Sequence, residues 1–235
     1  YAENLRKMFI AMAEDARVVF IKFADRIHNL KTLYALPPVK QQRIARETIE
    51  IYAPIANRLG MEELKGELED LSFPYVYPEE YKWTKQLIQK KYSERKRYTD
   101  KIMKKLEKDI TEHSSIKLIL MEGRAKHYYS LYKKLLNKDR DIDKIYDLVA
   151  MRIIVQGIDD CYHTLGHIHK LWKPVSGRIK DYIAQPKPNG YRSLHTTVYC
   201  DEGRIAEFQI RTQEMHQEAE YGIAAHWKFK EGEKN

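Results

Sequence analysis

The stretch that decides the fold is Asp147-Leu148-Val149-Ala150-Met151-Arg152-Ile153-Ile154-Val155. Its run of apolar residues is typical of a central strand that is buried on both faces of a sheet. A second strand is predicted at 204–211, where apolar and polar residues alternate. Its apolar face consists of Ala206, Phe208 and Ile210, and its polar face of Glu207, Gln209 and Arg211. The polar face is therefore available for chemistry.

Outward from these strands, the chain divides into two regions of different periodicity. Residues 1 to about 112 carry apolar residues at helical spacing, with breaks predicted at Leu36-Pro37-Pro38, at Leu59-Gly60 and across 73–78. In the remainder, strands are predicted near 116–122, 148–155, 194–200 and 204–211, and helices near 127–137, 159–171 and 213–227. The predicted fold class is α+β: a helical N-terminal region followed by a mixed β-sheet domain flanked by helices.

The composition favours anionic partners. Lysine and arginine total 42 against 34 for aspartate and glutamate, a net charge of +8, which suits nucleotide phosphates or RNA. Charged residues interrupt the first apolar positions, so neither a signal peptide nor a membrane span is predicted. Cys161 and Cys200 offer no disulfide framework and no metal-ligand spacing, so we expect a reducing cytoplasm. Because the first residue is Tyr1, we expect the sequence to be a piece of a longer chain.

Two segments have the composition of a nucleotide site. The first is Lys180-Asp181-Tyr182-Ile183-Ala184 followed by the Pro/Gly-rich segment 186–195, which combines cations with an aromatic ring. The second is Glu122-Gly123-Arg124-Ala125-Lys126, in which Gly123 is expected to permit a turn before a helix whose N-terminus meets polyphosphate. On its own the second segment also fits a capped strand–helix turn with exposed cations, and it does not match a Walker A loop.

Asp147 and Glu207 are the candidate metal ligands. Two carboxylates carried by strands can hold Mg²⁺, which binds carboxylate and phosphate oxygens together. Taken alone, Glu207 also fits a half-exposed antiparallel strand. The acid at the edge of the buried strand favours the metal site, because an unpaired buried charge costs several kcal/mol.

Six motifs in the second region resemble the synthetase domain of the RelA/SpoT family, whose members make and degrade (p)ppGpp. In chain order they are Gly123-Arg124-x-Lys126-x-x-x-Ser130, Tyr146-Asp147-Leu148-Val149-Ala150-x-Arg152, Arg178-Ile179-Lys180-Asp181-Tyr182-Ile183-Ala184, Pro186-Lys187-x-Asn189-Gly190-Tyr191-x-Ser193-Leu194-His195, Glu207-x-Gln209-Ile210-Arg211-Thr212 and Ala219-Glu220-x-Gly222-x-Ala224-Ala225-His226-Trp227. The resemblance implies a nucleotidyltransferase-like mixed sheet. It also implies transfer of the β,γ-pyrophosphoryl group of ATP to the 3′-hydroxyl of GDP or GTP, with release of AMP.

The same resemblance implies a role for each site residue. Asp147 and Glu207 would bind Mg²⁺, and Glu207 would also activate the 3′-hydroxyl; Arg124 and Lys126 complete the implied catalytic set. On the ATP side, Arg124 and Arg152 would flank adenine, Lys126 and Lys134 would bind phosphates, and Ser130 would make a secondary contact. On the GDP/GTP side, Tyr191 would stack on guanine, and the nucleotide would be lined by Lys180, Lys187, Asn189, His195 and Gln209.

The first region resembles other parts of the same family. Residues 1–39 resemble the end of an HD-type hydrolase domain, 40–112 a helical connector, and 113–235 the synthetase domain. Within Phe23-Ala24-Asp25-Arg26-Ile27-His28-Asn29, the resemblance makes Asp25 a metal ligand and Asn29 a substrate contact. Residues 1–24 contain no histidine to complete that metal site. We therefore expect a vestigial hydrolase site without activity.

The tetrad Arg178-Ile179-Lys180-Asp181 resembles the bifunctional branch of the family, so the parent chain is expected to combine synthetase and hydrolase activities. Ribosome and tRNA contacts would belong to C-terminal domains outside this sequence. Three alternatives stay open: a basic RNA-binding module, a noncatalytic nucleotide-sensing domain, and a polymerase-like nucleotidyltransferase that releases pyrophosphate. The choice between GDP and GTP and the oligomeric state do not follow from the sequence.

Overall fold

The N-terminal region is helical, as its periodicity predicts. The structure is a computed structural model that describes residues 15, 17–142, 145, 149–222 and 225. The first elements are α2 (Arg17–Lys31), a 3-10 turn (Leu33–Ala35), α3 (Pro38–Glu47), a π-helical turn (Thr48–Tyr52), α4 (Ala53–Arg58) and α5 (Glu62–Val76). They enclose a core of their own, which includes the fully buried side chains of Phe23, Leu30 and Leu68.

Two of the three predicted helix breaks are confirmed, and the third is narrower than expected. Helix α3 begins at Pro38, and Gly60, with φ of +77°, lies in the turn between α4 and α5. The third break is confined to Tyr77, because α5 continues through Pro74 to Val76. Pro78 takes the first position of the next helix, where its missing N–H costs nothing, and it keeps the preceding residue out of the helical conformation.

The helix that follows, α6 (Pro78–His113), is 36 residues long and joins the two regions. Ile88, in its first half, packs against Leu131 and Leu135 of α7 (Tyr128–Leu136). Ile102 and Leu106, in its second half, are fully buried in the core of the sheet domain. One helix therefore supports both α7 and the sheet.

Six strands form one mixed sheet in the described part of the chain. They are β1 (Leu118–Ala125), β2 (Val149–Val155), β3 (Lys173–Pro174), β4 (Lys180–Asp181), β5 (Leu194–Tyr199) and β6 (Ile205–Thr212), and α8 (Ile158–Leu171) and α9 (Gln213–Tyr221) complete the domain. The order is β1-β2-β6-β5-β3, and β4 also pairs with β5. Strands β2 and β6 are parallel, and the other pairs are antiparallel. The predicted α+β class is confirmed.

The segment around Gly123 differs from the prediction. We expected a turn there, but β1 continues to Ala125, because Glu122, Gly123 and Arg124 pair with β2 in an unbroken antiparallel register. The short strands β3 and β4 were not predicted, since two residues carry no periodicity.

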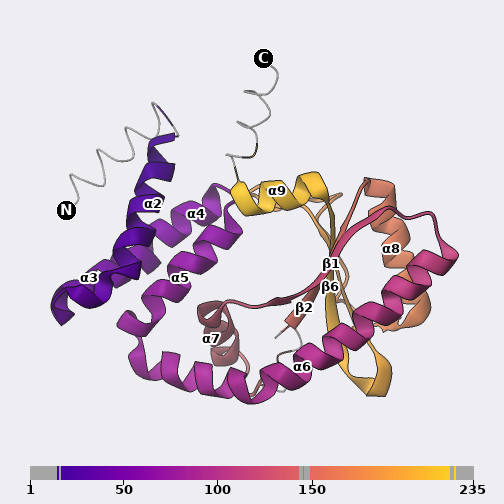
Figure 1. The fold of residues 1–235 in the computed structure, drawn as a ribbon, viewed down its shortest axis with the longest axis horizontal. Coiled ribbons are helices and arrows are strands. Elements are labelled where there is room, and N and C mark those ends of the chain that lie inside the picture. Colours follow the sequence, from indigo (N-terminus) through magenta and orange to yellow (C-terminus); the bar gives the residue numbers. More distant parts are fainter. Residues whose placement is uncertain (1–14, 16, 143–144, 146–148, 223–224, 226–235) are drawn as a thin grey trace.

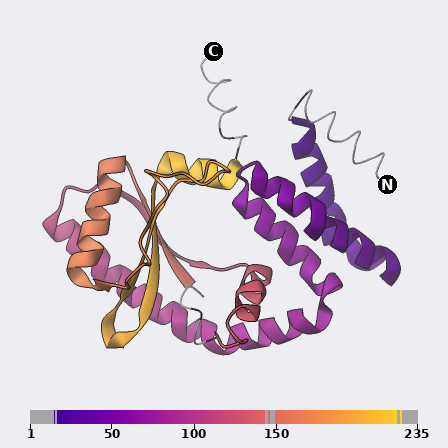
Figure 2. The ribbon, with the colours of Figure 1, turned by 180° about the vertical axis from the view of Figure 1, so that it is seen from behind.

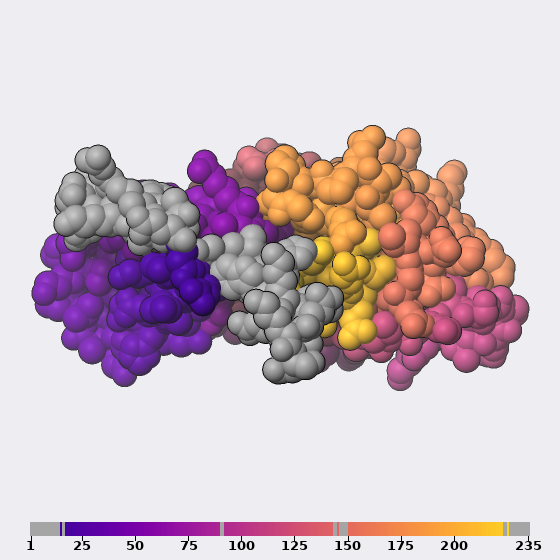
Figure 3. Space-filling view, turned by 90° about the horizontal axis from the view of Figure 1, so that it is seen from above, coloured from indigo at the N-terminus to yellow at the C-terminus, as the bar shows by residue number. Residues whose placement is uncertain are grey.

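The two faces of the sheet have different surroundings. Helix α8 and the second half of α6 cover one face, whereas α5, α7 and α9 lie toward the other (Figure 1), and the view from behind shows the same separation (Figure 2). From above, the N-terminal helices and the sheet domain occupy opposite ends of an elongated molecule (Figure 3). Phe208 and Ile210 of β6 are fully buried on the α6–α8 side. Among the described helices, none combines the length and the apolar character needed to cross a membrane.

Candidate functional site

A row of polar side chains crosses the face of the sheet that α6 and α8 leave uncovered. The strand registers place five residues side by side, one on each of β1, β2, β6, β5 and β4: Glu122, Arg152, Gln209, His195 and Lys180. Glu207 lies on the same face, two residues before Gln209 on β6, and faces Thr197 of β5. The alternation predicted for 204–211 is therefore confirmed: Glu207 and Gln209 belong to this polar row, whereas Arg211 is buried beside His216.

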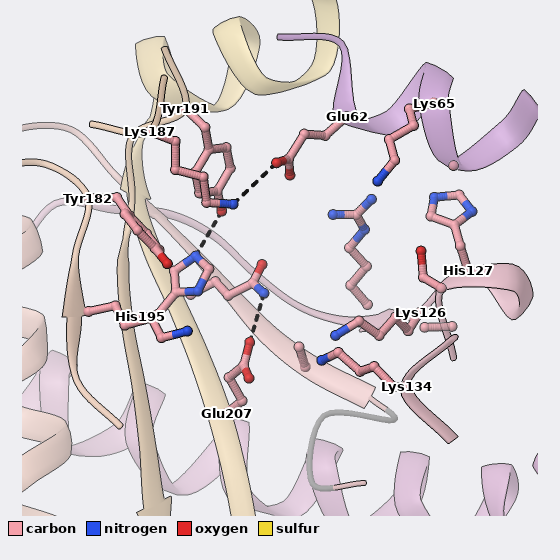
Figure 4. Close-up of a pocket in the computed structure, with 17 residues that line it drawn as sticks. Glu62, Lys65, Lys126, His127, Lys134, Tyr182, Lys187, Tyr191, His195 and Glu207 are labelled. Atoms are coloured by element: carbon pink, nitrogen blue, oxygen red, sulfur yellow. Dashed lines mark hydrogen bonds and ion pairs between the residues drawn. The ribbon is translucent and has the colours of Figure 1, made fainter. Parts of the chain in front are cut away.

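A cavity of about 310 Å³ lies between this polar surface, helix α5 and the start of α7 (Figure 4). Six lysine and arginine side chains of the described residues line it: Lys65, Arg124, Lys126, Lys134, Lys180 and Lys187. Its other side chains include two carboxylates, Glu62 and Glu207, and one tyrosine on each side of Lys187, Tyr182 and Tyr191. The excess of cations makes the cavity suited to an anionic ligand.

One wall of the cavity is formed by residues 124–134 and is called the β1–α7 wall here. Strand β1 carries Arg124, the loop carries Lys126, and α7 carries Ser130 and Lys134, which are one helical turn apart. In Figure 4, Lys126 and Lys134 point into the cavity from the same side. The structure therefore brings together the residues of the predicted ATP side, apart from Arg152.

The opposite wall is formed by residues 180–195 and is called the β4–β5 wall here. The Tyr191 hydroxyl and His195 Nε2 are hydrogen-bonded at 2.9 Å, and Lys187 Nζ lies 4.3 Å from the centre of the Tyr191 ring. Burial, together with the neighbouring cations, of which Lys187 has the largest effect, lowers the pKa of His195 to about 3. His195 is therefore neutral at pH 7, and the wall presents aromatic surfaces edged by lysines.

Glu207 lies between the two walls, on the floor of the cavity. Its Oε1 accepts a hydrogen bond of 3.0 Å from Gln209 Nε2. The second predicted metal ligand, Asp147, lies outside the described residues, and no group of three His, Cys, Asp or Glu side chains in the described part forms a metal site by itself. One carboxylate beside cations that suit phosphates fits a Mg²⁺ ion whose remaining ligands are phosphate oxygens and water.

Two predicted contacts are not on the cavity surface. Arg152 is buried beneath it, where its Nη1 donates to Glu122 at 3.1 Å and to Glu220 at 3.3 Å. Asn189 is turned away, and its amide donates to the backbone oxygen of Asn57 at 3.0 Å. The structure therefore gives both residues protein partners, and their ligand contacts stay predictions.

The predicted hydrolase residues lie elsewhere. Asp25 and Asn29 are exposed on α2, at the end of the molecule away from the sheet (Figure 1). They are hydrogen-bonded to each other, with 3.2 Å between Asn29 Nδ2 and Asp25 Oδ2. This arrangement is that of a polar helix face. Residues 1–14 lie outside the described part of the chain.

Helix α5 contributes residues that sequence reasoning missed. Glu62 pairs with Lys187 at 3.4 Å, and Glu63 binds Arg124 and lies 3.5 Å from His127 Nε2. Asp70 accepts hydrogen bonds from the ring of His127 and from the backbone N–H of Tyr129, both at 2.9 Å. The partners are about 60 to 125 residues apart in the chain, so no local pattern indicates them. The only hint in the sequence is His127 itself, a titratable residue between Lys126 and the start of a predicted helix.

These contacts fix the charge states at the junction of α5 and the β1–α7 wall. Burial alone would lower the pKa of His127, but its hydrogen bonds with Asp70 and Glu63 raise the pKa to about 9. The hydrogen bond with His127, together with the charge of Arg124, lowers the pKa of Glu63 to about 2. At pH 7 the junction therefore holds an imidazolium and a guanidinium against two carboxylates.

The fold and the cavity define a class: an α+β protein with a cation-lined pocket between a mixed sheet and a helical region. A family model described as "Region found in RelA / SpoT proteins" matches residues 123–234, and a model described as "HD domain" matches residues 1–62. Curated relatives about 50% identical extend over almost the whole chain. The chain belongs to the RelA/SpoT family.

Two of these relatives illustrate the similarity. The "Bifunctional (p)ppGpp synthase/hydrolase RelA" of Mycobacterium tuberculosis is 52% identical over 97% of this chain and 31% of its own length. The "GTP pyrophosphokinase" of Myxococcus xanthus is 50% identical over 98% of this chain and 30% of its own length. The chain thus spans about a third of each. Among solved structures, the small alarmone synthetase 1 of Bacillus subtilis bound to its product pppGpp is 27% identical over 60% of this chain and 82% of its own, with a TM-score of 0.46.

Proposed function

We propose that this chain is a (p)ppGpp synthetase that transfers the β,γ-pyrophosphoryl group of ATP to the 3′-hydroxyl of GDP or GTP and releases AMP. The observation that carries the proposal is the cavity with six lysine and arginine side chains, a tyrosine ring on one wall and Glu207 on its floor. The names of the relatives, which include GTP pyrophosphokinase and (p)ppGpp synthase, support the same reaction.

The β1–α7 wall is proposed to hold ATP. Arg124, Lys126 and Lys134 offset the charge of a triphosphate, and Ser130 adds a hydroxyl between the two lysines along the wall. Arg152, buried under the wall, would reach the adenine only after exchanging at least one of its carboxylate partners. The primary ATP contacts proposed are therefore the cations that line the cavity.

The β4–β5 wall is proposed to hold the guanosine nucleotide. The ring of Tyr191 offers a stacking surface, and Lys187 beside it and Lys180 on the same wall are available for the 5′ phosphates. His195 is neutral and already bound to the Tyr191 hydroxyl, so its proposed role is to hold that ring. Gln209 lies between His195 and Arg152 on the sheet and orients Glu207.

The proposed reaction is an in-line displacement at the β-phosphorus of ATP. Glu207 accepts the proton of the 3′-hydroxyl as the new O–P bond forms, and the bond between the α,β-bridging oxygen and the β-phosphorus breaks, so AMP leaves with the electron pair. A Mg²⁺ ion bound by Glu207 and the predicted ligand Asp147 would supply neutralisation of phosphate charge. The lysines stabilise the charge that remains on the phosphates in the transition state.

The domain assignment remains a proposal as well. We propose that 113–235 carry the synthetase fold, that 40–112 are a connector which also supplies α5 to the cavity, and that 1–39 end a hydrolase domain. Hydrolysis is not proposed for this chain, because Asp25 has no histidine among residues 1–24 as a partner. Ribosome or tRNA binding is not proposed for these residues either.

The test is product analysis. The chain is incubated with ATP, Mg²⁺ and either GDP or GTP, and AMP is measured alongside guanosine tetra- and pentaphosphate. Glu207→Gln is expected to reduce turnover about 100-fold or more, because the variant keeps the shape of the side chain and removes the base. Glu214→Gln, on an exposed side chain of α9, is the matched control and is expected to retain activity.

Each alternative predicts a different result. Pyrophosphate in place of AMP would indicate a polymerase-like enzyme. Nucleotide binding without turnover, unchanged in Glu207→Gln, would indicate a sensing domain. Salt-sensitive RNA binding without turnover would indicate an RNA-binding module.

A further inference from the structure

His127 stands at the corner where α5, β1 and α7 meet, and the motifs that identify the family leave its role open. It is the residue that precedes α7, and its imidazole lines the cavity beside Lys126, opposite Lys65 of α5 (Figure 4). The side chain is 21% exposed. A methyl group at Gly66 of α5 would overlap the ring, so α5 has room for His127 only because residue 66 is glycine. The close fit against Gly66 indicates that the ring occupies one defined position.

Both nitrogens of the ring face carboxylates of α5. His127 Nδ1 lies 2.9 Å from Asp70 Oδ2, and Nε2 lies 3.5 Å from Glu63 Oε1. Carboxylates only accept hydrogen bonds, so both nitrogens must carry protons to satisfy this geometry, and the ring is an imidazolium. The raised pKa of His127 agrees with this assignment.

Glu63 connects His127 to the cation that the proposed function needs. Its Oε2 binds Arg124, and its Oε1 faces His127. When a phosphorylated ligand takes Arg124, Glu63 loses that partner inside a cavity that now holds further negative charge. An unpaired carboxylate in this position would oppose ligand binding. Among the ion pairs of the described residues, His127 is the second cation beside Glu63 at this corner.

We propose that His127, as an imidazolium, is a positioning residue for the ATP subsite: it retains Glu63 and Asp70 on α5 and so makes Arg124 available to ATP. The proposal rests on the proposed function, because that function assigns ATP to the β1–α7 wall. Asp70 adds a second effect. Through its other oxygen it accepts the backbone N–H of Tyr129, so the pair with His127 also fixes the first turn of α7, which carries Ser130 and Lys134.

The effect is specific for one wall. The β4–β5 wall has its own contacts with the connector, between Lys187 and Glu62 and between Asn189 and the backbone of Asn57. Loss of His127 leaves these contacts in place. Binding of ATP is therefore expected to weaken, whereas binding of GDP is expected to stay unchanged.

The effect is also specific for charge. The titratable groups of the two cavities bordered by the ring, or bound to it directly, include Glu62, Glu63, Lys65, Glu67 and Asp70 of α5, Tyr81 of α6, Arg124 of β1, Lys126 of the loop, and Tyr128 and Lys134 of α7. Lys180, Lys187 and Glu207 line the far side of the larger cavity. The acids favour the imidazolium and the cations oppose it. As pH rises through about 9, the ring becomes neutral and releases its two acids. The affinity for ATP is expected to fall over this range in a way that depends on residue 127.

The experiment measures binding of α,β-methylene-ATP and of GDP by calorimetry at pH 7 and pH 9.5, for the chain and three variants. His127→Gln removes the charge, His127→Lys retains it, and Gly66→Ala displaces the ring from the opposite helix without changing any charge. We expect His127→Gln and Gly66→Ala to bind the ATP analogue about 10-fold more weakly at pH 7 with GDP affinity within about twofold, and His127→Lys to recover part of the loss. The fall in affinity for the ATP analogue between pH 7 and pH 9.5 should be smaller in His127→Gln than in the parent chain.

Three results would contradict the proposed role of His127. Equal losses for both nucleotides, unchanged ATP affinity in His127→Gln, or the same loss in His127→Lys would overturn the positioning role. If His127→Gln does not fold, Gly66→Ala and His127→Lys still decide between charge and shape. Turnover in the parent chain is measured in parallel. A chain that binds both nucleotides but makes no product contradicts the proposed function alone, whereas normal synthesis with a wild-type KM for ATP in His127→Gln contradicts the inference alone.

Discussion

The two walls of the cavity are held against the helical connector by different kinds of contact. The β1–α7 wall is fastened to α5 by charges: Arg124 and His127 meet Glu63 and Asp70. The β4–β5 wall is held mainly by uncharged contacts, called shape contacts here. The Asn189 amide donates a hydrogen bond to the backbone oxygen of Asn57, and the Gly60 turn packs closely against the backbone of Asn189. Ionic contacts respond to pH and to anionic ligands, and shape contacts do not. The β1–α7 wall is therefore the adjustable one and the β4–β5 wall the fixed one.

The largest effect is expected at the Gly60 turn, which contacts the β4–β5 wall and also packs against Gly222 at the end of α9. A methyl group at Gly222, which has φ of +57°, would overlap the backbone oxygen of Leu59 in the turn that also approaches Asn189. Gly222→Ala should lower the free energy of unfolding by about 3 kcal/mol, since backbone strain and overlap add. Urea unfolding measures it. Gly177→Ala is the control, because Gly177 has a similar φ of +69° but open space, and it should cost only about 1 kcal/mol.

A smaller loss is expected from the same change in the charged junction. Gly66→Ala forces the His127 ring to move, at a cost of about 2 kcal/mol, because a side chain yields more easily than a backbone oxygen. Gly166→Ala, in α8 where an added Cβ would meet nothing within 4 Å, should instead stabilise by roughly 0.5–1 kcal/mol through helix propensity. Thermal or urea denaturation of both variants checks the pair. Equal effects at Gly66 and Gly166 would contradict the packing of His127 against α5.

The charged junction also predicts a dependence of stability on pH. The pKa of His127 is raised from 6.5 to about 9 in the folded chain, so its stabilising effect is complete below pH 6.5 and is lost as pH rises through 9. Allowing for the solvent that the ring still contacts, about 1–2 kcal/mol should disappear over this range. Urea unfolding at pH 6 and pH 9.5 measures the slope. His127→Gln should flatten it; an unchanged slope in that variant would assign it to other groups.

The smallest effect is expected at the ionic contact of the fixed wall. Glu62 and Lys187 are 3.4 Å apart, and each side chain is about one-third exposed. Glu62→Gln should therefore change the free energy of unfolding by less than about 0.5 kcal/mol, as for most exposed pairs. Glu63→Gln is measured beside it and should cost more, because Glu63 has two cationic partners.

The elements that could be predicted are those whose pattern is local. The buried run at 148–155 and the alternation at 204–211 identified β2 and β6, and their parallel pairing brings Arg152 beside Gln209. The end of β1 was predicted too early, because Gly123 indicates a turn in isolation while pairing with Met151 keeps it in the strand. Pro74 was assigned to a break for a similar reason, although packing keeps α5 helical to Val76.

The site was predictable only in part. Ten of the residues proposed from the sequence line the cavity: Arg124, Lys126, Ser130, Lys134, Lys180, Lys187, Tyr191, His195, Glu207 and Gln209. The contribution of α5 was not predicted, because Glu63 and Asp70 resemble any acids on an exposed helix face until the fold places cations against them. Charge partners distant in sequence require tertiary structure.

Helix α6 packs against both α7 and the sheet and so relates the positions of these two elements. At 36 residues it is about 54 Å long, and α7, which carries Lys134, and the sheet, which carries Glu207, are seated at different points along it. Because both elements pack against one continuous helix, α7 and the sheet keep the same spacing when side chains in the cavity exchange partners. If α6 tilted by about 5° about its first residue, its last residue would move by roughly 5 Å relative to α5, which exceeds the length of a hydrogen bond. A small change of angle at Tyr77, between α5 and α6, would thus produce a large displacement at the far end of α6.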